Sequence, residues 1–151
     1  MVDNIAVEEL IVEKLKALSL FRTVEGLQGS LDEIGPLTLA LPAAYTIYAG
    51  AKSNTASSGS RAVLSMVSAE IEVIVIGENL RGRGEASLDV RRLLLAVRQA
   101  LNGMLIEDLG GNIKGMTLTW QEENFLHFVR PGVCAYGQKY QFISPWEMQK
   151  R

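Results

Sequence analysis

The chain has 151 residues, a length typical of one domain, and 48% of them are hydrophobic, which is enough to fill a core. With 15 basic and 17 acidic residues the net charge is −2, so no overall positive field attracts nucleic acid or an anionic membrane. The lone cysteine, Cys134, and the lone histidine, His127, exclude an intramolecular disulfide and most metal or triad sites. We therefore expect a single domain over residues 1–151 that folds without a metal or a disulfide.

No segment of the sequence has the pattern of an export signal or of a membrane span. The first residues include acids where a secretory signal needs basic ones. The longest apolar runs fall short of the ~20 residues that cross a bilayer. We expect a soluble, cytoplasmic protein.

The first half of the chain predicts one helix followed by strands. Apolar residues recur every three to five positions over residues 4–18, and lysines lie near the end of this segment, as the helix dipole favours. Short β-permissive runs predict strands at 21–27 and 43–48. Residues 52–61 are rich in serine and have almost nothing to bury, which predicts a flexible loop at the tip of a long hairpin.

A long alternating pattern predicts a strand over residues 62–76. Val73 and Val75 belong to its apolar face, whereas Glu70 and Glu72 share the opposite face. The far end of the segment is apolar on both faces, which indicates a central position in the sheet. A glycine-rich loop is expected at 77–85.

A second amphipathic helix is predicted between Ser87, as its cap, and Gly103, which ends it. After it, 116–120 and 125–129 predict either two short strands around a polar turn at 121–124 or one strand with a bulge. A Pro-Gly turn then leads to a last alternating strand over 133–143.

These elements have the order α-β-β-β-α-β-β-β. Strands in succession between two amphipathic helices predict an α+β fold, with a mixed, mainly antiparallel sheet and both helices packed on one face. The predicted core includes five residues from three of the elements: Leu15, Val73, Val75, Leu94 and Val97.

No catalytic or metal-binding residue is predicted. His127 alternates with apolar neighbours and no nucleophile motif accompanies it, while Cys134 opens a strand as a small buried hydrophobe does. Glu70 and Glu72 could share a proton or bind a cation, although two glutamates on a wet sheet face usually only solvate it. The Gly-Arg-Gly at 82–84 matches no phosphate-binding fingerprint.

Arginines are concentrated on one loop and the helix that follows it. Their guanidinium forks suit carboxylates and phosphates, so a subunit contact, a nucleic-acid contact and a merely solvated face all stay open, with nucleic acid disfavoured by the negative net charge. The cluster comprises Arg81, Arg83, Arg91, Arg92 and Arg98.

Three segments carry a family resemblance: Phe21–Glu25, Leu41–Ala51 and Val75–Gly82, the last followed by the arginine-bearing helix. Together they resemble a Mu-like prophage family of unknown function, which is similar to the tail terminator proteins of long-tailed phages such as lambda. The similarity covers residues 4–142. Within it, Asn79, Arg81 and Gly82 form a local motif that the resemblance places in an inter-subunit or lumen-facing loop.

The resemblance implies a structural role without chemistry or cofactor. Tail terminators assemble as six-fold rings, cap the tail tube, stop its growth and join the head, so the implied partners are further copies of the chain, the tail tube and head-completion proteins. A ring needs two different complementary patches, and the arginine cluster together with Glu70 and Glu72 or the Glu8/Glu9 pair offers them. The alternative is a monomeric or dimeric cytoplasmic binding module that uses the arginines as an anion site.

Overall fold

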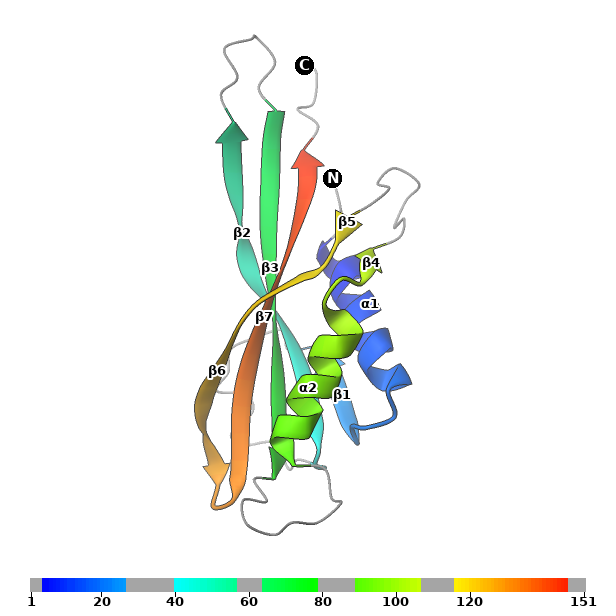
Figure 1. The fold of residues 1–151 in the computed structure, drawn as a ribbon, viewed down its shortest axis with the longest axis vertical. Coiled ribbons are helices and arrows are strands. Elements are labelled where there is room, and N and C mark those ends of the chain that lie inside the picture. The colour runs from blue at the N-terminus through cyan, green and yellow to red at the C-terminus, as the bar shows by residue number, and fades with distance from the viewer. Residues whose placement is uncertain (1–3, 27–39, 57–63, 79–88, 107–115, 147–151) are drawn as a thin grey trace.

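Pairing between long strands organises the fold (Figure 1). The computed structural model describes residues 4–26, 40–56, 64–78, 89–106 and 116–146. A five-stranded sheet has the order β1-β2-β3-β7-β6, in which only the β1–β2 pair is parallel. Its strands are β1 (Thr23–Gly26), β2 (Ala43–Ala56), β3 (Leu64–Glu78), β6 (Thr119–Arg130) and β7 (Val133–Trp146). Two-residue strands β4 (Leu105–Ile106) and β5 (Met116–Thr117) form a second, antiparallel pair.

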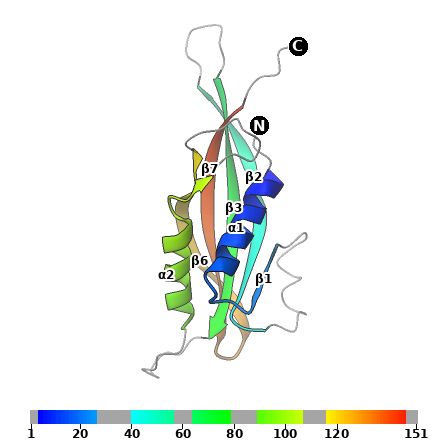
Figure 2. The ribbon, with the colours of Figure 1, turned by 90° about the vertical axis from the view of Figure 1, so that its right-hand side faces the viewer.

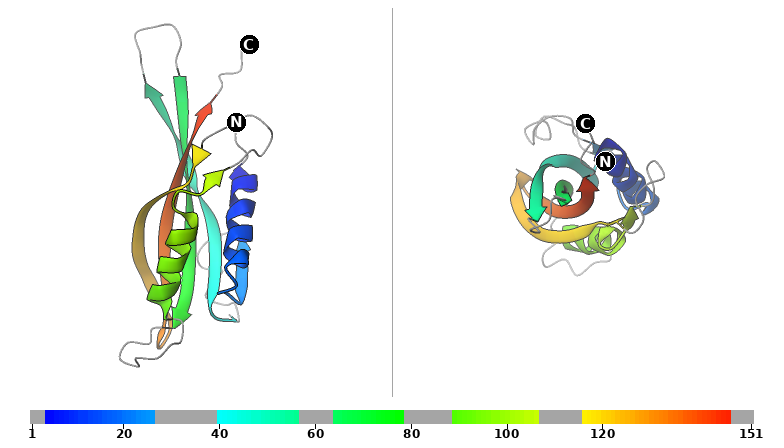
Figure 3. Two further views of the ribbon diagram at one scale, coloured as in Figure 1. Left: turned by 45° about the vertical axis from the view of Figure 1, so that its right-hand side comes forward. Right: turned by 90° about the horizontal axis from the view of Figure 1, so that it is seen from above.

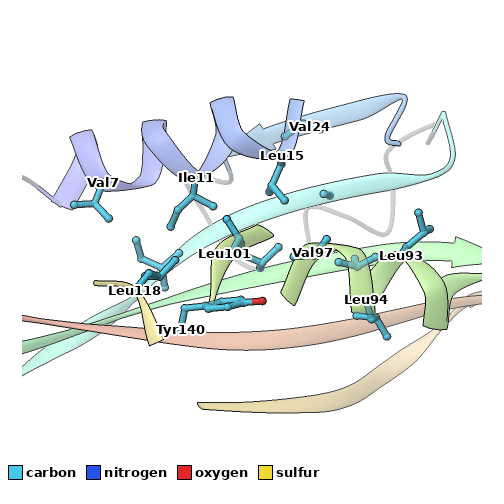
Figure 4. Packing of buried hydrophobic residues seen from close by; sticks show 14 of the residues in the cluster. Val7, Ile11, Leu15, Val24, Leu93, Leu94, Val97, Leu101, Leu118 and Tyr140 are labelled. Carbon is cyan, nitrogen blue, oxygen red and sulfur yellow. The ribbon is translucent and has the colours of Figure 1, made fainter. Parts of the chain in front are cut away.

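Two helices cover one face of this sheet: α1 (Asn4–Ala17) and α2 (Val90–Leu101). Helix α1 packs on β1 and β2, and α2 packs on β3, β6 and β7, so each helix lies toward a different edge (Figure 2). Figure 4 shows the core between the layers, where both helices meet Tyr140 and Leu118. The buried helical residues in that core are Val7, Ile11, Leu15, Val90, Leu93, Leu94, Val97 and Leu101.

Strand β3 is the centre of the sheet, as its pattern predicts. Val73 and Val75 face the helices, while Ile74 and Ile76 point to the other face, and all four side chains are fully buried. The helix-free face therefore has an apolar cluster of its own at this end of the sheet, to which Tyr45 belongs. Because both faces exclude water here, β3 reads as a continuous apolar run.

The α+β class, the mixed, mainly antiparallel sheet and the predicted element order are confirmed, with β4 as a short addition. Both helices lie on one face, and all five predicted core residues are buried. The first helix ends at Ala17, one residue before the predicted end. Seen along its length, the sheet is strongly twisted (Figure 3), which is the usual consequence of right-handed strand twist.

The loop predicted over 52–61 is wrong for its first half. Residues 52–56 continue β2 and pair with β3, where Lys52 lies opposite Ser68. Backbone hydrogen bonds hold such a ladder whatever the side chains are, so a polar composition does not exclude a strand. The rest of the predicted loop, 57–61, lies outside the described residues.

The end of β3 also differs from the prediction. Strand β3 continues through Gly77 and Glu78, which begin the loop predicted over 77–85, and the remainder of that loop lies outside the described residues. The ideal position of a Cβ on Gly77 lies 3.0 Å from Leu93 Cδ1, so this glycine permits the close approach of α2 to β3.

The polar turn predicted at 121–124 is also wrong. Strand β6 runs through it, and the pairing with β7 shifts register three times, at Gln121, Leu126 and Val129. These bulges disrupt simple alternation, and an edge strand tolerates polar residues on its wet side. Residues 119–130 therefore form one bulged strand, as the second alternative predicts, while 116–117 form the separate strand β5. The turn at Pro131 and Gly132 is confirmed.

Candidate functional site

Helix α2 carries the described part of the predicted arginine cluster. Its cap is Asp89, whose Oδ1 accepts a hydrogen bond from the backbone N–H of Arg91 at 2.8 Å. The predicted cap, Ser87, lies outside the described residues. At the other end Gly103 has a φ of +80°, a left-handed conformation that only glycine adopts easily, so the helix stops at Leu101.

Two of the arginines on α2 already have partners within the chain. Arg91 Nε lies 3.1 Å from Asp89 Oδ1, and this hydrogen bond raises the pKa of the guanidinium. The guanidinium carbon of Arg98 lies 5.0 Å from the centre of the Trp120 ring on β6, which is a cation–π contact. Both arginines therefore lie on the side of α2 that faces β6, where their charges are held in place.

Arg92 differs from these two. It is exposed, and within the described part of the chain it forms no ion pair. The other predicted members of the cluster, Asn79, Arg81 and Arg83, lie outside the described residues.

The helix-free face of the sheet carries the predicted carboxylates. Glu70 and Glu72 project from β3 to this face, and Lys139 of β7 lies directly opposite Glu72 in the strand register. Lys139 Nζ lies 3.0 Å from Glu122 Oε1 on β6 and 3.9 Å from Glu70 Oε1. Three carboxylates therefore surround one ammonium group, and the surface keeps a local negative charge.

Burial is the main cause of the pKa shift at Glu72. The pKa of Glu72 is raised, first by partial burial and then by Glu70 and Glu122, against the opposing effect of Lys139. Its side chain lies over Gly137 of β7, where the ideal position of a Cβ lies 2.9 Å from Glu72 Oε2. By contrast, the hydrogen bond from Lys139 lowers the pKa of the exposed Glu122.

These opposite shifts predict opposite pH responses. A raised pKa means that the folded state holds its proton longer than the unfolded state, so ionised Glu72 costs stability at neutral pH. We expect Glu72→Gln to raise the free energy of unfolding at pH 7, and the gain to vanish below the unfolded carboxyl pKa of about 4.3. The matched control Glu122→Gln should lose stability at pH 7 instead. Urea unfolding at fixed protein concentration measures both, and a loss in the Glu72 variant at pH 7 would contradict the assignment.

The sheet separates the two predicted surfaces. Helix α2 lies on one face, and Glu70 and Glu72 lie on the other, so the arginines of α2 do not meet these two carboxylates within the described part of one subunit. A contact between them would join two different molecules.

Nothing in the described residues forms a reactive cluster. His127 is exposed on β6, whereas Cys134 is buried on β7, where it lies opposite Phe128. Across the described ranges, no three His, Cys, Asp or Glu side chains lie together as a metal site would need. The helices described there are also too short and too polar to span a bilayer.

Sequence reasoning missed one surface. Phe125 and Phe128 are both exposed on β6, the edge strand of the sheet, and their rings contact each other with centroids 5.1 Å apart. The signal was present in the alternating apolar residues of 125–129, but the expected turn before them hid the long edge strand to which they belong.

A family model described as phage tail terminator protein matches residues 1–114, which span the elements from α1 to β4. No curated protein sequence matches the chain.

Proposed function

Because this chain belongs to the phage tail terminator family, and is thus a structural component of a phage tail, we propose that it caps the tail tube as a closed ring. The ring has six copies, stops the growth of the tube and provides the surface to which the head joins. Its partners are further copies of this chain, the tail tube protein and a head-completion protein. It performs this role by binding, without catalysis.

One observation carries the proposal: each subunit has two separate surfaces of opposite charge. Helix α2 has three arginines and no acidic residue in a chain of net charge −2, and the acidic surfaces lie elsewhere. When two different patches of neighbouring subunits meet, the interface is heterologous. Such an interface closes into a ring if the rotation between successive subunits divides a full turn evenly. The arginines of α2, with Arg81, Arg83 and Asn79 before them, lie near the subunit boundary or the lumen.

Two acidic surfaces are candidates for the arginine partner. One comprises Glu70 and Glu72 on the helix-free face, and the other comprises Glu9 and Glu13, the exposed glutamates of α1. Of the expected Glu8/Glu9 pair, Glu8 is half-buried and accepts a hydrogen bond from Thr46 Oγ1 at 2.7 Å.

The proposal predicts both a mass and a phenotype. We expect the purified protein to show a mass near six subunits by light scattering. In a phage from which the gene is deleted, tails should grow to irregular lengths and fail to join heads, because nothing stops tube polymerisation. Electron microscopy of negatively stained lysates measures tail length.

The control for this experiment is supply of the intact gene in trans, which should restore uniform tails. Tails of uniform length that carry heads without the gene would contradict the capping role. A protein that stays monomeric both at high concentration and on tube ends would contradict the ring.

A further inference from the structure

The edge of the sheet formed by α2 and β6 exposes large apolar side chains. Leu95 of α2 is 46% exposed, and on β6 Phe125 and Phe128 are 47% and 64% exposed. The Phe125 ring also meets Tyr136 edge to face, with centroids 5.5 Å apart, so the aromatic side chains hold one another in position. Phe125 and Phe128 lie beyond residue 114, outside the part of the chain that the family model matches.

Strand β6 adds a free backbone edge to this surface. It is the outermost strand of the sheet and, within the described residues, pairs only with β7. A long edge strand with exposed aromatic side chains is a template for association unless something covers it. We name this surface, which comprises Arg91, Leu95, Arg98, Phe125 and Phe128, the α2/β6 edge.

The α2/β6 edge carries positive charge along one side of α2. Arg91, Leu95 and Arg98 follow one another at spacings of four and three residues, which puts them on one side of α2. Arginines and aromatic side chains around an apolar centre are the composition of strongly binding interface residues.

The opposite edge of the same sheet has the complementary character. On α1, Ile5 is 68% exposed, and the exposed Glu9 and Glu13 follow it at four-residue spacing along the same side of the helix. Strand β1 is the other outermost strand and, within the described residues, pairs only with β2. Together α1 and β1 contain four glutamates and two lysines, whereas α2 and β6 together contain four arginines and two glutamates. We name this surface, Ile5, Glu9, Glu13 and β1, the α1/β1 edge.

We propose that copies of this chain join edge to edge, with the α2/β6 edge of one molecule on the α1/β1 edge of the next. This inference rests on the proposed ring and identifies its contact surface. Strands β6 and β1 are at opposite ends of the sheet, and Figure 2 shows α2 on one side of the subunit and α1 with β1 on the other, as a head-to-tail ring requires. Pairing of two α2/β6 edges with each other would instead bring arginines against arginines.

Charge also selects between the two acidic surfaces. Glu70 and Glu122 already have Lys139 as an ionic partner, and Glu72 is partly buried beside it. Glu9 and Glu13 are exposed, and neither forms an ion pair within the described part of the chain. Glu9 and Glu13 are therefore the better partners for an arginine such as Arg91, whose side chain stays 65% exposed although it pairs with Asp89.

The test uses two variants that each lose one edge. Variant A carries Leu95→Asp and Phe128→Asp, which puts charge into the α2/β6 edge. Variant B carries Ile5→Lys, Glu9→Lys and Glu13→Lys, which reverses the charge of the α1/β1 edge. All five side chains are exposed, so both variants should fold, as circular dichroism and thermal melting can verify. If variant A melts early, Phe128→Ser alone replaces it.

We expect each variant alone to have the mass of one subunit by native mass spectrometry. Mixed together, they should form a species of two subunits, one of each variant, because A keeps an intact α1/β1 edge and B an intact α2/β6 edge. As a matched control, Ile143→Asp changes an exposed residue of the helix-free face and should leave the ring of the unmodified protein unchanged.

Each other outcome has a distinct meaning. Rings formed by variant A or by variant B alone would overturn the edge-to-edge contact while the proposed function stands. Monomers that do not combine on mixing would also overturn it, since a head-to-tail contact requires the mixed pair. Failure of the unmodified protein to assemble, in solution and on tube ends, would overturn the proposed ring itself.

Discussion

Leu94→Ala is expected to lower the free energy of unfolding by about 2–5 kcal/mol, the usual cost of truncating a leucine in a closed core. Leu94 is 3% exposed and belongs to the cluster between α2 and the sheet, shown in Figure 4. The truncation removes apolar contacts and leaves a cavity that neighbouring strands cannot easily close. Chemical denaturation monitored by circular dichroism measures the change.

The matched control for this variant is Leu105→Ala. Leu105 is 47% exposed on β4, outside both sheet edges, so its truncation should change stability by less than about 0.5 kcal/mol. Neither substitution touches an edge surface, so the oligomeric state should stay the same in both. Equal losses in the two variants would show that α2 does not pack on the sheet as described.

The second large effect is expected at Gln138, a fully buried polar residue of β7. Its Nε2 donates hydrogen bonds to the Leu94 carbonyl oxygen at 2.9 Å and to Glu123 Oε1 at 2.7 Å. Its Oε1 accepts a hydrogen bond from the Tyr140 hydroxyl at 2.7 Å. This one side chain therefore joins α2, β6 and β7, and burial raises the pKa of Tyr140, so the hydroxyl stays protonated as a donor.

Removing either member of the Gln138–Tyr140 pair should be costly. Tyr140→Phe leaves Gln138 Oε1 without its donor, at about 1–3 kcal/mol for a buried unsatisfied group. Gln138→Ala also leaves the Tyr140 hydroxyl unpaired and opens a cavity, so we expect a larger loss. Unfolding free energies from urea titrations give both values.

A double-mutant cycle distinguishes this network from simple loss of volume. Because the two side chains share one hydrogen bond, the double variant should lose less than the sum of the single variants. Strict additivity would mean that the hydrogen bond between them does not contribute to stability.

Local pattern was sufficient for most of the fold. The α1 segment follows a helical period, and the alternation of β3 identifies both its buried faces and its central place, because side-chain direction along a strand or helix depends only on local geometry. The family resemblance, which rests on packing and turn patterns, agrees with the family that the comparison shows. The sequence also sufficed to place Glu70 and Glu72 on one strand face, opposite to Val73 and Val75.

Strand ends and bulges could not be read in this way. Residues 52–56 are polar, yet they extend β2 because β3 lies beside them and completes their backbone hydrogen bonds. The polar residues 121–124 remain in β6 because the bulges fit them to β7 and because Lys139 of that strand pairs with Glu122. In both cases pairing with a strand that is distant in sequence decides the structure, and local β-propensity carries no information about that strand.

The candidate site likewise has features that local sequence determines and features that depend on contacts between distant segments. The sequence by itself determined that arginines cluster on α2, that no reactive motif accompanies them, and that the chain resembles a family of phage tail proteins. Only the tertiary structure decided that Arg98 is held by Trp120, that the carboxylates lie across the sheet from α2, and that Phe125 and Phe128 lie on an outer edge. Strand order sets which side chains share an edge, and that order arises from long-range pairing rather than from any local run of residues.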